Sequence, residues 1–359
     1  MSKAAISVAM ATYNGERFLQ KQLDSLARQT LLPFELVVCD DGSTDGTLEI
    51  LRRFATTAPF RVRIYQNETR LGPGFNFLSA LSRCSGDLVA FCDQDDVWKE
   101  SKLRVCAKVM SDPSVALVSH SAAVLSSQPL ARHLRHPDHR ACVWRSCGDF
   151  AAHRWELLGF SMVLRRAVLN SAHVPEYSAD LSPWCAHDVW ATAAALSCGQ
   201  VVLLPDELSF YRLHENNATL RLHPRGLTRM PPEPSALERG AQNFAGLARF
   251  LRYAASFCDE PARRTFYDYI GQVDRSGSLC TKRAQLHRAC GRRLTAIRML
   301  AGMLAKGNYA PRSLGVKAFV RDALLVAFWT AHESVVTDTA FASQGISIPN
   351  KSTVKQKRD

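Results

Sequence analysis

The chain of 359 residues lacks any apolar segment long enough to cross a bilayer. Its longest apolar run near the C-terminal end, residues 323–329, is far shorter than the roughly 20 residues that a transmembrane helix needs. A signal peptide pattern is also missing, because a strand-like segment begins at residue 6. We therefore expect a cytoplasmic protein, and peripheral docking at the inner face of the cytoplasmic membrane stays open.

Cysteine spacings that would indicate a metal site or a disulfide framework are missing as well. The 11 Cys are scattered along the chain, and Cys39 and Cys92 fall inside predicted strands. Such usage is typical of a protein in a reducing cytosol. The apolar fraction of 47% and the charged fraction of 22% are ordinary for a globular protein.

Acidic residues are scarce between residues 250 and 317, where 13 Lys and Arg outnumber 4 Asp and Glu, giving +9 of the chain's net charge of +12. Helical spacing of apolar residues recurs in this part of the chain, at 236–253, 262–273, 279–304 and 318–329. A basic helical surface suits anionic lipid headgroups. Nucleic acid would attract it too, but no aromatic ladder or nucleic-acid fold signature accompanies it, so we predict no nucleic-acid partner. A soluble basic bundle is the remaining alternative.

Strand and helix patterns alternate through the first 100 residues or so. Apolar, β-prone segments predict strands at 6–10, 35–39, 61–65 and 88–92. The residues between them show helical spacing, so that Leu48, Leu51 and Phe54, for example, share one face. This order predicts an α/β fold with a mostly parallel sheet and helices on both faces.

Three carboxylates follow the fourth predicted strand directly. Asp93, Asp95 and Asp96 lie within four residues, where the apolar run 88–92 leaves the sheet. Like charges crowded in this way repel one another unless a cation neutralises them. Ligands of open α/β sheets bind at the carboxyl ends of the strands. We therefore predict a hard divalent cation that holds a phosphorylated substrate, and a solvated acidic turn is the alternative.

Polar residues also follow the first two predicted strands. The segment 35–39 runs into Asp40, Asp41 and Gly42, and Gly42 permits a tight turn. The segment 6–10 leads into the polar exit loop 11–16. Three strand exits therefore carry polar groups to one edge of the predicted sheet.

Five short segments, taken in order, resemble the family 2 glycosyltransferases of the GT-A fold. They are ATYNG at 11–15, VCDDGSTD at 38–45, CDQDDVW at 92–98, AHDVW at 186–190 and FYRLHENN at 210–217. The likeness covers residues 4–220, and the version of the motifs is most similar to bacterial rhamnosyltransferase-type members that build surface polysaccharides. The resemblance implies a Rossmann-like GT-A catalytic domain.

The resemblance also implies roles for the acids after the fourth strand. Asp93 and Asp95 fill the family's Asp-x-Asp positions, with Asp95 the direct ligand of Mg²⁺ or Mn²⁺ and Asp93 on the donor side as well. His214 corresponds to a position that completes the metal or phosphate shell, and an exposed loop histidine is the alternative. Asp96 either assists or fixes the turn.

The same resemblance assigns donor recognition to the residues that follow the first two predicted strands. Asp40 matches the position that accepts a hydrogen bond from the pyrimidine ring, and Asp41 is its neighbour. Thr12, Asn14 and Glu16 would line the base and ribose side of the pocket. Ordinary turn chemistry is the alternative for Thr12 and Asn14.

The acceptor side needs a general base, because the attacking hydroxyl loses its proton as the new bond forms. By resemblance Asp188 takes this role, and a helix cap is the alternative. The family usually has Gly where this chain has Ala186, which leaves the geometry of the loop open. Acceptor or phosphate contacts are predicted at six further positions, Gly159, Phe160, Trp184, His187, Arg212 and Asn217.

We predict three parts: a catalytic domain at 1–225, a basic helical region at 235–340 and a disordered tail at 341–359. The chain would be an inverting transferase that moves a sugar, L-rhamnose from dTDP-rhamnose, to a lipid-linked cell-surface glycan. A transferase that uses a UDP-hexose and an inactive sugar-binding scaffold are the alternatives. A sugar-phosphate nucleotidyltransferase is rejected, because the loop 12–16 is not the Gly-rich triphosphate loop with a basic residue that such an enzyme would carry.

Overall fold

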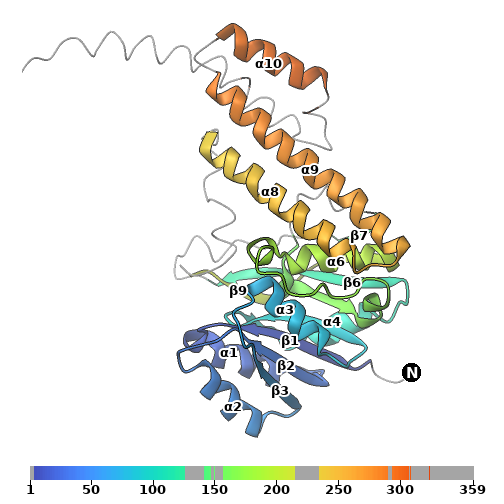
Figure 1. The fold of residues 1–359 in the computed structure, drawn as a ribbon. Coiled ribbons are helices and arrows are strands. Elements are labelled where there is room, and N and C mark those ends of the chain that lie inside the picture. The colour runs from blue at the N-terminus through green and yellow to red at the C-terminus, as the bar shows by residue number, and fades with distance from the viewer. Residues whose placement is uncertain are drawn as a thin grey trace, which may run out of the picture. The chain divides into compact units, whose positions relative to one another are not determined.

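Figure 1 shows a computed structural model of the chain, which describes residues 4–125, 141–146, 149, 157–214, 234–289, 293–306, 308 and 323. The chain divides into two compact units, Met1–Thr281 and Lys282–Asp359. Several predictions lie outside the described residues: the predicted contact Asn217, the predicted tail at 341–359 and nearly all of the helix at 318–329.

A nine-stranded mixed sheet forms the centre of the first unit, in the order β3-β2-β1-β4-β8-β6-β9-β5, with β7 paired to β9. Its strands are β1 (Ile6–Thr12), β2 (Glu35–Asp40), β3 (Arg61–Gln66), β4 (Leu88–Asp93), β5 (Val97–Trp98), β6 (Val115–Leu125), β7 (Cys142–Trp144), β8 (Met162–Arg165) and β9 (Gln200–Arg212). The four predicted N-terminal strands are confirmed, and they pair in parallel. Antiparallel partners enter with β8, β5 and β7, while β6 and β9 pair in parallel. The four N-terminal strands, which are all parallel to one another, carry the predicted donor site.

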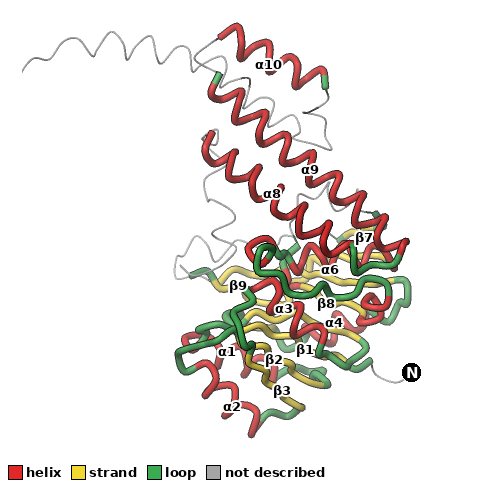
Figure 2. Tube along the Cα trace, viewed as in Figure 1, coloured by secondary structure: helices red, strands yellow, loops and turns green. Residues whose placement is uncertain are grey.

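Helices cover both faces of this sheet (Figures 1 and 2). The α-helices within the described residues are α1 (Glu16–Ala27), α2 (Thr47–Thr57), α3 (Pro73–Ser82), α4 (Lys102–Val109), α6 (His187–Cys198), α8 (Pro234–Ala255), α9 (Glu260–Arg288) and α10 (Arg293–Ala305). Because side chains alternate along a strand, Val8 and Met10 of β1 pack with α1, α2 and α4, whereas Ala9 and Ala11 pack with α3 and α6. The sheet therefore separates two hydrophobic cores.

The helix α8 and the first part of α9 belong to the unit that contains the sheet. Phe250 of α8 and Phe266 of α9 are completely buried, and they belong to the same core as α3 and α6. The domain boundary expected between residues 225 and 235 stays a prediction, but α8 and the first part of α9 share a hydrophobic core with the sheet. No helix within the described part of the chain is long and apolar enough to cross a membrane.

Candidate active site

Three loops meet at the carboxyl ends of β1, β2 and β4. The register pairs Thr12 with Asp40 and Ala11 with Asp93, so the last residues of these parallel strands lie side by side. Parallel pairing brings polar residues that are far apart in sequence to one edge of the sheet, where ligands of α/β folds bind. The gathering of polar groups predicted from the sequence is therefore present.

Asp40 is completely buried and holds the second loop together. Its carboxylate accepts hydrogen bonds from the hydroxyls of Thr12 (2.8 Å) and Ser43 (2.6 Å) and from the backbone N–H groups of Gly42 (3.2 Å) and Ser43 (2.8 Å). A carboxylate has about four lone-pair sites, and these four donors occupy them. Asp40 can therefore accept from a pyrimidine ring only by giving up one of these bonds, and its expected role in base recognition stays a prediction.

Asp41 fastens the loop before α3 to the same edge. Its carboxylate accepts from the backbone N–H groups of Leu71 (2.7 Å) and Gly72 (2.8 Å) and from the side-chain amide of Asn67 (3.1 Å). Gly72 has a φ of +79°, a backbone conformation that favours glycine. Asp41 thus sets the position of the loop that leads into α3.

Asn14 and Glu16 brace the first loop against the second. The Asn14 side chain accepts from the Thr44 N–H (2.9 Å), and the Glu16 carboxylate accepts from the Gly46 N–H (3.0 Å). Asn14 has a φ of +48°, which Asn tolerates better than most residues. Thr12, Asn14 and Glu16 therefore lie at the predicted donor edge in turn-forming bonds, and their contact with a nucleotide stays a prediction.

The acids after β4 form a cluster that can hold a cation. One carboxylate oxygen each from Asp93, Asp95 and Asp96 lies within 4.8 Å of the other two. Asp96 is completely buried, and its Oδ1 accepts from the Arg212 N–H (2.9 Å). Its Oδ2 has no hydrogen-bond partner among the described residues. A buried carboxylate oxygen without a partner is costly, and coordination of a cation would remove that cost.

Burial and the repulsion between charges raise the pKa of Asp93 and of Asp96. Burial raises the pKa of Asp93 to about 8, with further contributions from the charges of Asp95 and Asp188. Burial, followed by the charges of Asp95 and Asp93, raises the pKa of Asp96 well above its usual range. A bound divalent cation would reverse these shifts, so the donor set fits Mg²⁺ or Mn²⁺.

Arg212 and His214 reach the cluster from the end of β9. The Arg212 Nε–H donates to the backbone oxygen of Asp95 (2.8 Å), and the His214 Nε2 lies 2.8 Å from the Asp95 Oδ2. Both side chains lie near the ring of Phe18, at 4.8 and 5.0 Å from its centroid. The structure thus brings His214 into contact with the predicted metal ligand, while its own place in a metal shell stays a prediction.

Asp188 lies in the first turn of α6. Its charge contributes to the raised pKa of Asp93, after burial and the charge of Asp95. The Val189 N–H donates to the Asp188 Oδ1 (2.8 Å), and no hydrogen bond to Oδ2 is found within the described residues. Ala186 has a φ of −104°, so replacing the family's glycine with Ala costs no backbone strain.

The comparisons with known proteins agree with this geometry. Residues 7–167 match the model of glycosyl transferase family 2. These residues form a family 2 glycosyltransferase domain. A relative from Escherichia coli, UDP-Glc:alpha-D-GlcNAc-diphosphoundecaprenol beta-1,3-glucosyltransferase WfgD, is 25% identical over 220 residues, which cover 60% of this chain and 80% of the relative. The dTDP-rhamnosyl transferase RfbG of Shigella flexneri is 34% identical over 99 residues, 26% of this chain and 34% of RfbG.

Two solved structures share the fold of this protein. One is Staphylococcus aureus TarS 1–349 in complex with UDP-GlcNAc, with a TM-score of 0.53, 19% identity and coverage of 91% of this chain and 92% of TarS. The other is the mannosyltransferase PcManGT of Pyrobaculum calidifontis in complex with GDP-Man and Mn²⁺, with a TM-score of 0.52, 20% identity and coverage of 94% and 89%. These likenesses confirm the predicted GT-A fold.

Three of the predicted acceptor-side residues are packed against other side chains of the protein. His187 stacks on Phe77 with ring centroids 4.2 Å apart, and burial lowers the pKa of His187. A Cβ atom on Gly159 would lie 2.2 Å from the His187 Nε2, so Gly159 makes room for this imidazole. Phe160 is buried and stacks on Tyr211 at 5.1 Å. Direct contact of these residues with an acceptor stays a prediction.

The buried position of Lys102 was not predicted from the sequence. It is completely buried, its Nζ donates to the Phe160 backbone oxygen (2.7 Å), and it lies 3.4 Å from the centroid of the Trp98 ring. Burial lowers the pKa of Lys102 to about 8, and the charges of Asp96 and Asp93 oppose that shift. The available signal was weak: Lys102 precedes Cys106 by one helical turn, on the buried side of α4.

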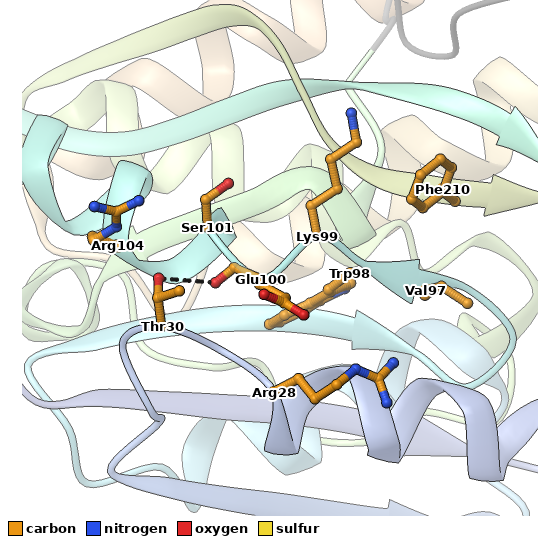
Figure 3. A pocket seen from close by; sticks show the side chains of 9 residues that line it. All are labelled: Arg28, Thr30, Val97, Trp98, Lys99, Glu100, Ser101, Arg104 and Phe210. Atoms are coloured by element: carbon orange, nitrogen blue, oxygen red, sulfur yellow. Dashed lines mark hydrogen bonds between the residues drawn. The ribbon is translucent and has the colours of Figure 1, made fainter.

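A surface cavity of about 560 Å³ lies beside Trp98 (Figure 3). It is lined by Arg28, Thr30, Val97, Trp98, Lys99, Glu100, Ser101, Arg104 and Phe210, so it shares no residue with the predicted site. The geometry of the donor edge, and not this cavity, therefore carries the functional argument.

Proposed function

We propose that this protein transfers a sugar from a nucleotide-sugar donor to a hydroxyl group of a growing, lipid-linked glycan, with inversion at the anomeric carbon. The observation that carries the proposal is the cluster of Asp93, Asp95 and Asp96, together with Asp188, whose charge acts on Asp93. The protein thus offers a group for the leaving diphosphate and a group for the attacking hydroxyl. An inactive scaffold would have no need of either.

The cation would be held by Asp95 and Asp93, with Asp96 beside them. A divalent ion in this place stabilises the negative charge that develops on the departing nucleoside diphosphate. Arg212, which spans Asp95 and Asp96, adds a positive charge next to the same phosphates. PcManGT, a protein of the same fold, was solved in complex with a sugar nucleotide and Mn²⁺, which supports this choice of ion.

Asp188 acts as the general base of the transfer. One of its oxygens accepts from the Val189 N–H, and this bond fixes the orientation of the carboxylate at the start of α6. The other oxygen is then available to accept the proton of the acceptor hydroxyl as the glycosidic bond forms. Asp93 beside it is held partly protonated without a cation, so metal binding and the ionised state of the site are linked.

The donor we favour is dTDP-rhamnose, and the acceptor is a lipid-linked surface polysaccharide. The likeness to RfbG, a dTDP-rhamnosyl transferase, supports the rhamnosyl donor. The likeness to WfgD, a glucosyltransferase that uses UDP-Glc, supports both a diphosphoundecaprenol acceptor and the alternative, a UDP-hexose donor. A peripheral position at an anionic membrane fits such an acceptor, and α10 exposes Leu294, Ile297 and Leu304 in a strongly basic part of the chain.

Thermal stabilisation by a panel of nucleotide sugars, with and without Mn²⁺, tests the proposal. A Mn²⁺-dependent shift with dTDP-rhamnose, followed by transfer of rhamnose to a polyprenyl-diphosphate-linked sugar, is the expected result. A thermal shift with UDP-glucose alone would support the same mechanism with a UDP-hexose as the donor.

Asp95→Asn should abolish transfer with the fold retained, and transfer at the wild-type rate by this variant would show that Asp95 is not a metal ligand.

A further inference from the structure

A glycine in the middle of α8 marks the place where this helix meets the acceptor side of the site. A Cβ atom on Gly246 would lie 2.0 Å from Cδ2 and 2.3 Å from Cε3 of the Trp184 ring. Contacts this short do not occur, so the indole rests directly on the glycine backbone. Glycine weakens a helix interior, and a close approach such as this one is a physical reason for its presence there.

Trp184 lies just before the proposed base. It ends the short 3-10 helix Ser182–Trp184, and α6 begins at His187, one residue before Asp188. The position of the Trp184 ring therefore limits where the chain can enter α6. A shift of this ring would displace the Asp188 carboxylate, because Asp188 follows Trp184 by only four residues.

The same loop is held at two more points. Phe250, one turn after Gly246 on α8, meets Phe75 edge-on at 5.9 Å, and Phe75 meets Tyr177 at 5.4 Å. The Ser182 hydroxyl donates to the Leu71 backbone oxygen. Leu71 in turn donates its N–H to Asp41 in the donor loop. The loop 177–184 thus lies between α8 and the donor side of the site.

We infer that α8 positions the acceptor side of the site. Because Gly246 has no side chain, the Trp184 ring can pack against the backbone of α8, and Trp184 in turn holds the loop 177–184 and Asp188 in place relative to the acid cluster. Gly246 lies outside the residues that match the family model, so this contact adds to the family domain. The inference rests on the proposed role of Asp188 as the base. It makes Gly246 and Trp184 positioning residues, which act through Asp188.

Gly246→Ala and Gly240→Ala form a matched pair that tests the inference. Both glycines lie in α8, but a Cβ atom on Gly240 would meet only the Cys280 Sγ, at 3.6 Å. We expect Gly246→Ala to lower kcat/KM for the acceptor about 10- to 100-fold, the effect of misplacing a catalytic group by about 1 Å. Binding of the nucleotide sugar, measured by calorimetry, should stay within about twofold of wild type. Gly240→Ala should keep both values.

Trp184→Ala keeps the inference testable if Gly246→Ala does not fold. This variant leaves α8 unchanged and should show the same loss for the acceptor with donor binding retained. In the Trp184→Ala background, Gly246→Ala should cause no additional loss, because the ring that it displaces is gone. Wild-type acceptor kinetics in a folded Gly246→Ala or Trp184→Ala protein would overturn the inference, as would equal losses of donor and acceptor binding.

Asp188→Asn separates this inference from the proposed function. If Asp188→Asn transfers sugar at the wild-type rate, the proposed base is wrong, whatever the α8 variants do. If Asp188→Asn is inactive while folded Gly246→Ala and Trp184→Ala are fully active, the base stands and the role of α8 is wrong.

Discussion

The affinity of the acid cluster for Mn²⁺ should depend steeply on pH. Burial, with the charges of Asp95 and Asp188, raises the pKa of Asp93 to about 8 in the metal-free protein. The protonated form of Asp93 then predominates at pH 7. A cation binds the ionised carboxylate, so binding must release the proton.

The magnitude follows from this linkage. For each pH unit below 8, the apparent affinity for Mn²⁺ should fall about tenfold, which corresponds to about 1.4 kcal/mol of binding free energy. The pKa of Asp96 is raised as well, so a second proton would make the dependence steeper if Asp96 is also a ligand. Titration calorimetry between pH 6 and 8, in two buffers with different heats of ionisation, measures both the affinity and the number of protons released.

Two variants control this experiment. Asp93→Asn removes the titrating group, so the slope of log affinity against pH should fall by about one. Asp112→Asn changes a fully exposed acid whose Oδ1 accepts from Ser114, and the slope should be unaffected. An affinity for Mn²⁺ that stays constant from pH 6 to 8 would refute the reasoning.

The same group makes stability depend on pH. The pKa of Asp93 in the folded state, about 8, lies above the value near 3.9 of an unfolded chain, so the folded state binds more protons between these values. The metal-free protein should therefore lose stability as pH rises from about 4 to 8. Mn²⁺ stabilises only the folded state, so its effect on the Tm should be larger at pH 8 than at pH 6.

Three further predictions concern the base and the C-terminal helices. Asp188→Asn should lower turnover by about two or more orders of magnitude with donor binding unchanged, as measured by initial rates and calorimetry. Deletion of residues 235–359 should abolish the cooperative thermal transition, because it removes five large buried side chains whose burial stabilises the fold by about 10 kcal/mol, a typical total for a domain. They are Phe250, Leu251, Phe266, Tyr269 and Ile270. Replacing the three exposed apolar residues of α10 with Ser should weaken sedimentation with phosphatidylglycerol vesicles.

Each of these predictions could be contradicted by a specific result. Unchanged turnover in Asp188→Asn would end its assignment as the base. A deletion variant with a sharp, wild-type transition would show that the catalytic unit ends before α8. For the vesicle experiment, Leu32→Ser with Phe34→Ser is the matched control, because both residues are exposed apolar side chains of the first unit. Equal vesicle binding by wild type and the α10 variant would contradict docking through α10.

The parallel half of the sheet could be predicted from the sequence because its signals are local. The apolar run before Asp93 and the run before Asp40 each mark a strand, and the register then brings the acids together. The hydrogen-bond partners of Asp40 could not be predicted in the same way. Its donors come from β1 and from its own turn, and only the folded chain shows that they occupy all of its lone pairs.

Packing over long sequence distances accounts for what the sequence did not reveal. Helical spacing predicts that α8 has an apolar face, but it does not say which surface covers that face, and the partner is the catalytic core. The burial of Lys102 could not be predicted from the sequence either, because a lysine in an amphipathic helix is usually solvated. Its burial depends on the backbone oxygen of Phe160, 58 residues away.

Gln94, the middle residue of the Asp-x-Asp run, both accepts and donates a hydrogen bond. The Gln94 Oε1 accepts from the Tyr13 N–H (3.0 Å), and its Nε2 donates to the Tyr13 backbone oxygen (3.0 Å). A carboxylate cannot donate and an ammonium cannot accept, so a neutral amide suits this place in a way that neither charged residue does. A Cβ atom on Gly15 would lie 2.3 Å from the Gln94 Oε1. The residues allowed at positions 15 and 94 should therefore depend on each other in any protein that keeps this pairing of the two loops.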